Sequence, residues 1–416
     1  MKNRYSITDR LRVISPVVLF FLSLQGFSQT ESADSLKEVI EVHEGRINAI
    51  DERVLINEAD LSKLTKIKIS GYIQAQYENY GDDLEKTLGS SNTFSVRRAR
   101  IKFAYEVTDG VKFVLQPDFG QGLLSLKDAY GVVNIPKFKQ FSLWAGQFNR
   151  PNYEVEYSSS QREVFERSRV IRTIYPGERE IGVKFEYNGS AIPLKVQLAA
   201  LNGNYPGLLA RDIDSKKDLM GRFVYSLNLA DAGIGIDFGA HTYLGGNLAK
   251  TNPYVKNSDG TLDSMKVWSY LDKKWAGGEV QIFADVLGGM AIKAEYIAGV
   301  NSTVSTISSS STPPQMQADP NRVRNFAGYY IYLIKNIGQK NQAVARYDFY
   351  DPNTTLKGDA AGSDLYYKTW TFAIQHYLND FIRISLNYEM PVNEVNASNP
   401  ADRKDNIFGV RIQAKF

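Results

Sequence analysis

Three basic residues, Arg98, Arg100 and Lys102, alternate along the chain with apolar residues at positions 99, 101, 103 and 105. A period of two is that of a β-strand, so the basic side chains would line one face and the apolar ones the other. Guanidinium and ammonium groups bind small anions, and arginine can hold phosphate through two parallel hydrogen bonds. The pattern predicts a strand that carries a ladder of anion-binding side chains on one face.

A second group of charged residues lies between residues 149 and 178, a long segment without any alternating pattern. A structureless connection of this length inside a compact fold is uncommon unless it has a function. Its arginines could face the basic ladder and add to an anion site. Its glutamates could instead neutralise the basic side chains and hold the segment in place. The arginines that could face the ladder are Arg162, Arg167, Arg169 and Arg172, and the glutamates available to neutralise it are Glu154, Glu163 and Glu166.

The elements that would position these residues are strands, because the period of two continues from residue 67 to the end of the chain. Every second connection is a short turn, and the intervening ones, except residues 120–123, are mostly long and polar. This sorting is typical of outer-membrane β-barrels, and a soluble sandwich has no reason for it. The predicted strands lie near 67–80, 93–107, 111–119, 124–134, 141–148, 179–187, 193–201, 218–229, 234–244, 277–286, 290–299, 326–335, 341–350, 367–377, 381–389 and 406–416.

The sequence therefore predicts an all-β fold, a transmembrane antiparallel β-barrel of about 16 strands over residues 67–416, a size that leaves an aqueous channel. Residues 149–178 would join the fifth and sixth strands and fold inward to narrow the bore. If the apolar faces meet lipid, a small excess of basic over acidic side chains points inward. Besides the loop arginines, the residues predicted to line the pore or bind anions are Arg98, Arg100, Lys102, Lys112 and Arg222.

Both ends of the sequence fit an exported outer-membrane protein. Residues 1–28 have a basic head, a short apolar core and small residues for cleavage, which is the form of a secretory signal peptide. Residues 29–66 carry apolar residues at heptad spacing, with Asn57 on the seam. They predict a periplasmic coiled coil, or a single amphipathic helix at the barrel mouth. The last strand ends in Phe416, which resembles the signal that the barrel-assembly machinery recognises.

Composition excludes several classes of protein. Mean hydropathy is −0.31, and after the N-terminus no apolar run reaches the ~20 residues of a membrane-spanning helix. The formal net charge of +3 is too small to argue for nucleic acid. There are no cysteines. The histidines, His43, His241 and His376, have neither a serine motif nor a close set of metal ligands beside them. The sequence predicts no enzyme, no metal and no cofactor.

Several short motifs follow one another along the predicted barrel. They are Arg97-Arg98-Ala99-Arg100, Leu126-Lys127-Asp128-Ala129-Tyr130, Gly146-Gln147-Phe148, Glu166-Arg167-Ser168, Pro176-Gly177-Glu178-Arg179-Glu180-Ile181-Gly182, Asn202-Gly203, Ala294-Glu295-Tyr296, Ala345-Arg346-Tyr347-Asp348 and Val410-Arg411-Ile412-Gln413. In order and spacing they resemble the phosphate-selective porin O and P family. The resemblance implies a trimeric barrel and passive, anion-preferring diffusion, with phosphate or polyphosphate as the best-known cargo. The chain departs from the family's Gly-Gln-Phe-Lys-x-Pro-Phe pattern, because Asn149 replaces the basic residue and Asn152 the aromatic one.

These observations predict a porin of the outer membrane, with its N-terminal segment in the periplasm, that lets small anions diffuse passively. The expected partners are anionic solutes, outer-membrane lipid, the barrel-assembly machinery and two further copies of the chain. Two alternatives remain open: a general porin without ion preference, and a structural or adhesive barrel that uses its long outer loops.

Overall fold

The computed structural model describes residues 42–47, 49–58, 66–151, 155–156, 159–203, 212, 214–249, 254–303 and 321–416. Contacts divide the chain into two units, residues 1–65 and residues 66–416. In the first unit, residues 42–47 and 49–58 are helical. Ile47, Ile50 and Val54 of the predicted seam are exposed there, and the coiled coil stays a prediction. The predicted signal peptide, residues 1–28, lies outside the described residues. Within the described residues, no helix combines the length and the apolar character needed to cross a membrane.

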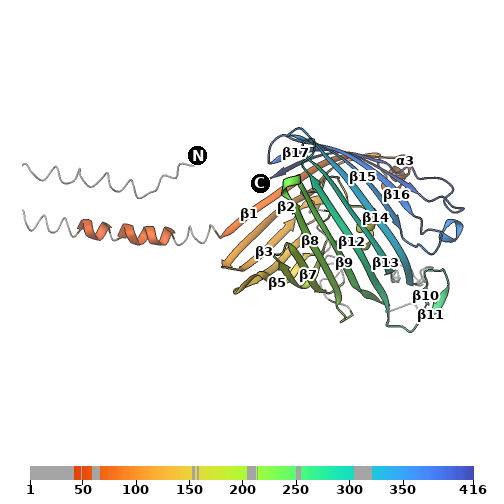
Figure 1. Ribbon diagram of the computed structural model, residues 1–416, viewed down its shortest axis with the longest axis horizontal. Coiled ribbons are helices and arrows are strands. Elements are labelled where there is room, and N and C mark those ends of the chain that lie inside the picture. The colour runs from red at the N-terminus through yellow and green to blue at the C-terminus, as the bar shows by residue number, and fades with distance from the viewer. Residues whose placement is uncertain are drawn as a thin grey trace, which may run out of the picture. The chain divides into compact units, whose positions relative to one another are not determined.

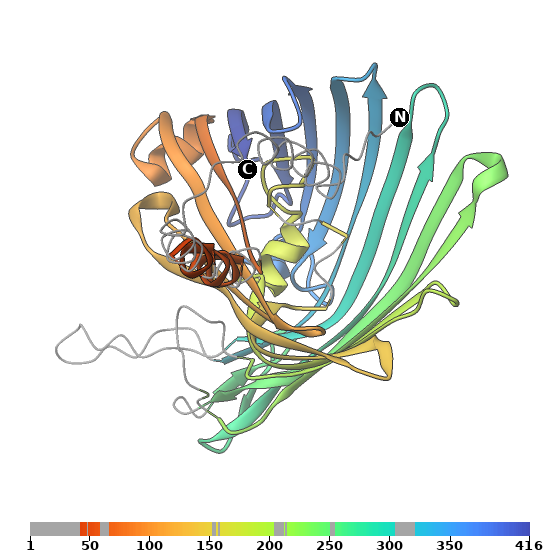
Figure 2. The same ribbon diagram turned by 90° about the vertical axis from the view of Figure 1, so that its left-hand side faces the viewer.

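The second unit is a closed antiparallel β-barrel (Figures 1 and 2). Its sheet contains 18 strands among the described residues. Two of them, β10 and β11, form a hairpin outside the wall, which leaves 16 in the wall. Successive wall strands pair with one another, and β1 pairs with β18 to close the barrel. The predicted fold class is confirmed. The wall strands are β1 (Ile67–Tyr80), β2 (Asn92–Thr108), β3 (Val111–Asp118), β4 (Ser125–Ile135), β5 (Phe138–Asn149), β6 (Arg179–Asn188), β7 (Leu194–Leu201), β8 (Asp218–Leu229), β9 (Ile234–Ala249), β12 (Ser269–Ala284), β13 (Met290–Thr303), β14 (Asn321–Ile337), β15 (Asn341–Asp351), β16 (Tyr367–Tyr377), β17 (Ile382–Asn393) and β18 (Ile407–Lys415).

The two faces of the wall follow the sequence alternation. On β16, Trp370, Phe372 and Ile374 are exposed on the outer face, whereas Thr371 and Gln375 are buried on the inner face. An apolar outer face and a polar inner face are what a barrel needs when lipid surrounds it and its lumen is polar. The alternation therefore decides which side chains can reach the lumen.

The remaining elements lie in the connections. The hairpin of β10 (Tyr254–Lys256) and β11 (Leu262–Ser264) joins β9 to β12, and β10 pairs in parallel with the start of β14. Short turns and longer connections alternate along the described chain as predicted, and the brief link between β3 and β4 is again the exception. Within the described part of the barrel unit, the helices are α3 (Asp82–Leu88), η2 (Gly120–Gly122), α4 (Arg169–Ile174), η3 (Ala230–Ala232) and η4 (Gly358–Ala361).

Most strands begin and end within a few residues of their predicted bounds, and the start of β12, the start of β14 and the end of β9 differ most. The ends of β9 and β12 that differ pair with each other. Their pairing continues to Ala249 and Ser269, well beyond the predicted ends. In this extension Asp272 and Lys274 form an ion pair of 2.9 Å with both side chains about half exposed. Where a wall rises beyond the lipid, both of its faces meet water, so the alternation that reveals a strand is lost.

Candidate functional site

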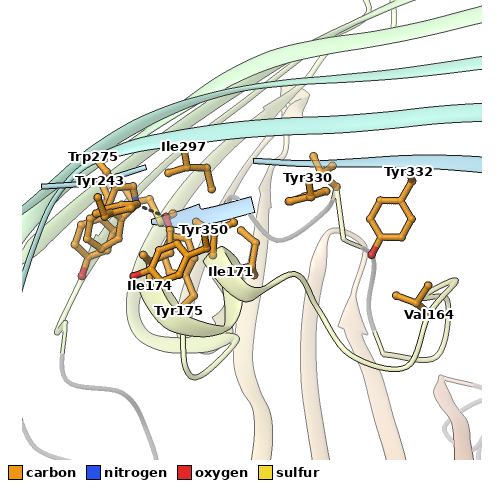
Figure 3. Close-up of a cluster of buried hydrophobic side chains, with 14 of the residues drawn as sticks. Val164, Ile171, Ile174, Tyr175, Tyr243, Trp275, Ile297, Tyr330, Tyr332 and Tyr350 are labelled. Atoms are coloured by element: carbon orange, nitrogen blue, oxygen red, sulfur yellow. Dashed lines mark hydrogen bonds between the residues drawn. The ribbon is translucent and has the colours of Figure 1, made fainter. Parts of the chain in front are cut away.

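The loop between β5 and β6, residues 150–178, lies inside the barrel and is called the inner loop below; its helix α4 is seen within the ring of strands in Figure 2. Val170, Ile171 and Ile174 of α4 are buried. Their spacing places them on one face of the helix, and α4 packs against β14 and β15. The inner loop is thus ordered by a hydrophobic core within the lumen (Figure 3).

Aromatic side chains of the wall complete this core. The rings of Tyr243 and Trp275 stack with their centroids 4.2 Å apart. Tyr175, which follows α4, meets Trp275 edge-on, and its hydroxyl accepts a hydrogen bond of 2.6 Å from the indole nitrogen. Aromatic pairs of this kind contribute about 0.5–1.5 kcal/mol beyond the area that they bury. This part of the inner loop is therefore held mainly by apolar packing.

Two wall glycines leave room for inner-loop side chains. A Cβ atom at Gly328 would lie 2.7 Å from Cβ of Val170, and one at Gly409 would lie 2.5 Å from a ring carbon of Phe165. Carbon atoms attract one another best at about 3.5–4.0 Å, so atoms this close would repel. A larger residue at either glycine would force the inner loop away from the wall.

Glu156 fixes the inner loop through buried polar contacts. Its carboxylate accepts hydrogen bonds from the backbone N–H of Ser168 at 2.7 Å and from the hydroxyl of Tyr332 at 2.8 Å. Arg346 of β15 lies 3.3 Å from the same carboxylate and donates to the backbone carbonyl of Glu166 at 2.7 Å. Removing one partner from a buried charge pair costs about 3–5 kcal/mol. Glu156 therefore has a structural role in the loop.

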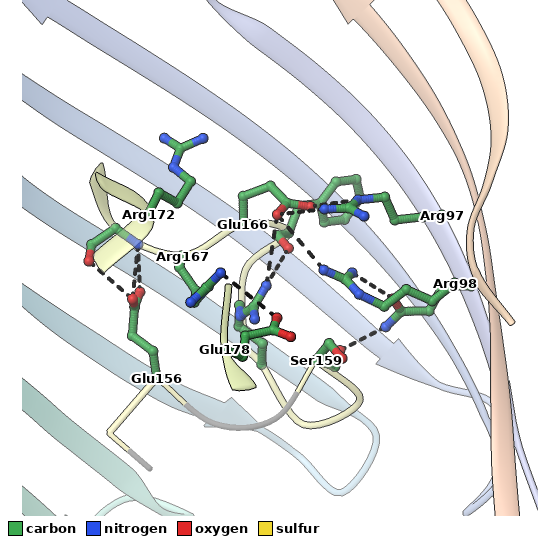
Figure 4. Close-up of polar contacts among 12 residues, drawn as sticks. Arg97, Arg98, Glu156, Ser159, Glu166, Arg167, Arg172 and Glu178 are labelled. Atoms are coloured by element: carbon green, nitrogen blue, oxygen red, sulfur yellow. Dashed lines mark hydrogen bonds and ion pairs between the residues drawn. The ribbon is translucent and has the colours of Figure 1, made fainter. Parts of the chain in front are cut away.

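Near β2 and β18, four arginines surround the carboxylate of Glu166. Figure 4 labels two of them, Arg97 and Arg98, beside Glu166. Arg97 donates two hydrogen bonds of 3.1 Å to it. Arg411 lies 3.5 Å away, Arg98 lies 3.9 Å away and Arg162 lies 4.0 Å away. These five side chains, called the arginine cluster below, come from β2, β18 and the inner loop. They carry four positive charges against one negative charge.

A β-bulge explains why both Arg97 and Arg98 reach Glu166. The pairing of β1 with β2 skips Arg97, since neighbouring residues of β1 pair with Val96 and Arg98. The sequence analysis predicted Arg98 and missed Arg97, because strict alternation places adjacent residues on opposite faces. The sequence does contain a sign of the bulge. The apolar residues of the alternating pattern are at even positions at 94 and 96 and at odd positions from 99 to 105.

A cavity of about 350 Å³ adjoins the arginine cluster. Its lining contains six basic and three acidic residues, so cations are in excess. The Nε atom of Arg98 is buried and has no hydrogen-bond partner within the described residues. A lining with these charges attracts small anions and offers them hydrogen-bond donors. The charged lining residues are Arg97, Arg98, Arg100, Lys127, Arg167 and Arg179, with Asp118, Glu166 and Glu178.

The other two members of the predicted ladder have different surroundings. Arg100 lies 2.7 Å from Asp118 of β3 and donates to the hydroxyl of Ser159 in the inner loop at 2.8 Å. Its charge is therefore paired, and it helps to hold the loop, as the alternative in the sequence analysis described. Lys102 is partly buried and lines a second cavity, of about 190 Å³, together with Lys184.

The loop arginines divide between two sides of the lumen. Arg162 belongs to the arginine cluster, and Arg167 lines the adjoining cavity. Arg169 instead lies over the ring of Tyr367, 3.7 Å from its centroid. Arg172 forms an ion pair of 3.1 Å with Glu389 of β17. Only the first two face the predicted ladder.

The last two predicted residues lie away from the arginine cluster. Arg222 of β8 donates two hydrogen bonds to Glu279 of β12, so its charge is balanced within the wall. Lys112 of β3 lies on the same inward face as Val114, but it is exposed because it is near the end of its strand. Neither residue lines the cavity beside the cluster.

The arginines also determine the ionisation of two loop carboxyl groups. Burial alone would raise the pKa of Glu166, but the four surrounding arginines outweigh burial and hold this pKa below its usual value of 4.5. Burial likewise opposes the ionisation of Glu178, yet Arg179 and Arg167 hold its pKa well below the usual range. Both groups are therefore ionised at neutral pH, and the cationic excess of the site already includes their negative charges.

A closed barrel with an apolar outer face, a polar lumen and an ordered loop inside that lumen defines the class of the protein. The barrel fold and the family match described next are those of outer-membrane porins. Residues 67–250 match the sequence profile described as phosphate-selective porin O and P. This range includes β1 to β9 and the inner loop, so the predicted resemblance is confirmed. No curated relative matches the sequence.

Solved structures of outer-membrane proteins share the fold at low identity. An anion-selective porin from Comamonas acidovorans is similar with a TM-score of 0.52 and 10% identity, over 84% of this chain and 99% of that one. The outer-membrane channel DcaP of Acinetobacter baumannii has a TM-score of 0.53 and 14% identity, over 84% and 97%. OmpT of Vibrio cholerae in its trimer form has a TM-score of 0.52 and 13% identity, over 84% and 99%. At these identities the likeness establishes the fold alone.

Proposed function

We propose that this porin prefers anions, and that small anions such as phosphate bind on their way through at the arginine cluster and the cavity beside it. The observation that carries the proposal is the convergence of four arginines on one carboxylate next to a cavity with excess positive charge. Charges at a narrow point of a pore act most strongly on a passing ion, because water screens them least there.

Glu166 would set how tightly the site holds an anion. Its carboxylate already occupies the centre of the arginine cluster, so it stands where a solute anion would find most donors. A passing phosphate would share the arginines with Glu166 or displace it from some of them. Conduction needs a site that attracts an ion and still releases it. Because the carboxylate of Glu166 lowers the net positive charge of the site, an anion should bind weakly enough to be released and pass through.

Phosphate is proposed as the preferred solute for two reasons. The family matched by residues 67–250 carries phosphate in its description. Arginine also suits phosphate better than chloride, since its planar group can donate two parallel hydrogen bonds to a tetrahedral oxyanion. A similar structure is described as an anion-selective porin, which supports the coarser preference for anions.

The test is to measure chloride current through single channels in a planar bilayer while phosphate is added. The proposal expects added phosphate to reduce the chloride current. The same concentration of added chloride, as the control, should not reduce it. The Arg97→Gln/Arg98→Gln variant should lose this block and keep open channels. Chloride current unaffected by phosphate in the unmodified protein would make the chain a general porin. A folded protein without any current would favour a structural or adhesive barrel.

We also propose that the barrels form a homotrimer, with the N-terminal helices in the periplasm. Support comes from the trimer form of the similar OmpT structure and from Ile47, Ile50 and Val54, which are exposed at heptad-compatible spacing. The mass of the detergent-solubilised protein, measured with and without residues 29–66, tests the trimer and the contribution of the N-terminal helices to it. A monomeric mass for the full chain would contradict the trimer.

A further inference from the structure

Three potential metal ligands meet in the barrel wall, away from the arginine cluster. His241 of β9, Glu279 of β12 and Glu295 of β13 each place one ligand atom within 4.8 Å of the others. Their side chains are 0%, 2% and 1% exposed. Strand pairing brings them together, because Glu279 pairs with Glu295 and His241 pairs with Gly277 next along β12. Ligands so far apart in the sequence escape a search for close spacing, which is why the sequence analysis predicted no metal.

Each carboxylate is oriented by a neighbour that leaves it able to bind an ion. Tyr330 donates its hydroxyl hydrogen to Oε2 of Glu295, while Oε1 lies 2.7 Å from Nε2 of His241. Arg222 donates to both oxygens of Glu279. Each carboxylate oxygen keeps a second lone pair for another partner. Hydrogen bonds of this kind commonly orient the ligands of protein metal sites.

Polar atoms at the centre of the trio are buried without hydrogen bonds. Within the described residues, Oε1 of Glu295 and both ring nitrogens of His241 have no hydrogen-bond partner, and the close contact between Nε2 and Oε1 lacks hydrogen-bond geometry. A buried polar group without a hydrogen bond destabilises the folded protein. Two carboxylates beside one arginine also leave one negative charge uncompensated. A cation among these atoms would remove both costs.

The backbone makes room for the imidazole ring. A Cβ atom at Gly277 would lie 2.4 Å from Nε2 of His241. With glycine at this position, the ring can lie across β12 and reach Glu295 on the strand beyond. Any other residue at position 277 would push His241 away from the two carboxylates.

We propose that His241, Glu279 and Glu295 bind a divalent first-row metal ion such as Zn²⁺, through Nε2 and one oxygen of each carboxylate. One imidazole nitrogen with two carboxylate oxygens is a suitable ligand set for such ions, and three protein ligands leave a position for water. The ion would link β9, β12 and β13. It would also support the inner loop, because the ring of Tyr330 packs edge-on against Tyr332, which binds Glu156. This site does not depend on the proposed anion path.

The test uses the full-length protein in detergent, stripped with EDTA and then titrated with Zn²⁺ by calorimetry and with Co²⁺ by its visible absorption. One Zn²⁺ per chain is expected. Replacing a ligand with His241→Gln or Glu295→Gln should abolish binding. Tyr330→Phe removes only the orienting hydrogen bond and should weaken binding by about 10- to 100-fold. The matched control is His376→Gln, because His376 hydrogen-bonds to Asn341 at 2.8 Å and lies outside the trio.

A heat-dependent shift in gel mobility, typical of folded barrels, would establish that each variant is folded. The proposal is overturned if the unmodified protein takes up no Zn²⁺ or Co²⁺. It is also overturned if His241→Gln binds as tightly as the unmodified protein. Loss of binding in His376→Gln would assign the ion to a different site.

Discussion

The two sides of the lumen hold the inner loop in different ways. Beside β12 to β15, α4 packs on aliphatic and aromatic side chains, and the nearby charges are paired, as Arg346 is with Glu156. Beside β1, β2 and β18, the loop is held by polar contacts in which arginines outnumber carboxylates. The order of strands places β2 and β12 about half a turn apart around the wall. The position of the loop and the ion preference of the pore should therefore respond to different mutations.

The largest expected effect is on the arginine side. In Arg97→Glu/Arg98→Glu, the arginine cluster changes from four positive charges and one negative charge to two positive and three negative. The ion preference, measured as the reversal potential in a KCl gradient, should change from chloride to potassium, because the local field changes sign. Arg172→Glu is the control, because Arg172 pairs with Glu389 of β17 outside the arginine cluster, and it should shift the potential much less. Equal shifts in the two variants would contradict the comparison.

The second effect concerns the packed side. Gly328→Leu places atoms where Val170 lies, so α4 should be displaced and the free energy of unfolding should fall by about 1–3 kcal/mol. The single-channel conductance should rise, since the loop no longer fills the lumen in the same way. Gly278→Leu on β12 is the control, because a Cβ atom there would meet only one atom, at 3.9 Å. Unchanged conductance in Gly328→Leu would show that α4 does not limit the pore.

A third and smaller effect separates the two roles of the loop carboxylates. Glu166→Gln removes the negative charge shared by four arginines, so phosphate should bind about tenfold more tightly, as a modest gain in Coulomb attraction predicts. Glu163→Gln changes the same group in the same loop, but its partner is Lys293 on the packed side. That control should leave phosphate block unchanged. A weaker block in Glu166→Gln than in the unmodified protein would show that Glu166 organises the site.

The smallest effect is in the pH dependence of stability. The pKa of Glu166 is lower in the folded protein than in the unfolded chain, where it is near 4.5. Ionised Glu166 therefore contributes fully to the free energy of unfolding above pH 4.5, and this contribution is lost as the pH falls through the pKa of the folded state. The difference in unfolding temperature between the unmodified protein and Glu166→Gln should therefore stay constant from pH 8 to about pH 5 and shrink only in stronger acid. A difference that disappears already at pH 6 would contradict the arginine contacts of Glu166.

The barrel could be predicted from the sequence because each wall strand must place apolar side chains toward lipid and polar side chains toward the lumen. This requirement produces an alternating pattern within each strand. The bounds of β1, β8 and β16 were predicted to the residue. The ends of β9 and β12 could not be, since water on both faces removes the alternation there. The hairpin of β10 and β11 escaped prediction for the same reason.

The site was predictable only in part, because it depends on which segments meet in space. Alternation identified Arg98 and Arg100 but could not show that Asp118 pairs with Arg100 while Arg98 shares Glu166 with three other arginines. The role of Arg411 depends on closure of the barrel, which brings the last strand beside the first. Arg169 and Arg172 lie apart from the arginine cluster because α4 positions them beside Tyr367 and Glu389, and the sequence alone does not reveal those neighbours.

The most direct test of the central claim is the reversal potential of the unmodified protein in a planar bilayer that separates two KCl concentrations. An excess of arginine charge at the site predicts a reversal potential with the sign of a chloride-selective channel. This potential should move toward zero as the salt concentration rises, because salt screens the arginine cluster. A potential at zero in dilute salt would mean that the loop carboxylates neutralise the arginines completely. A potential on the potassium side would contradict the account outright.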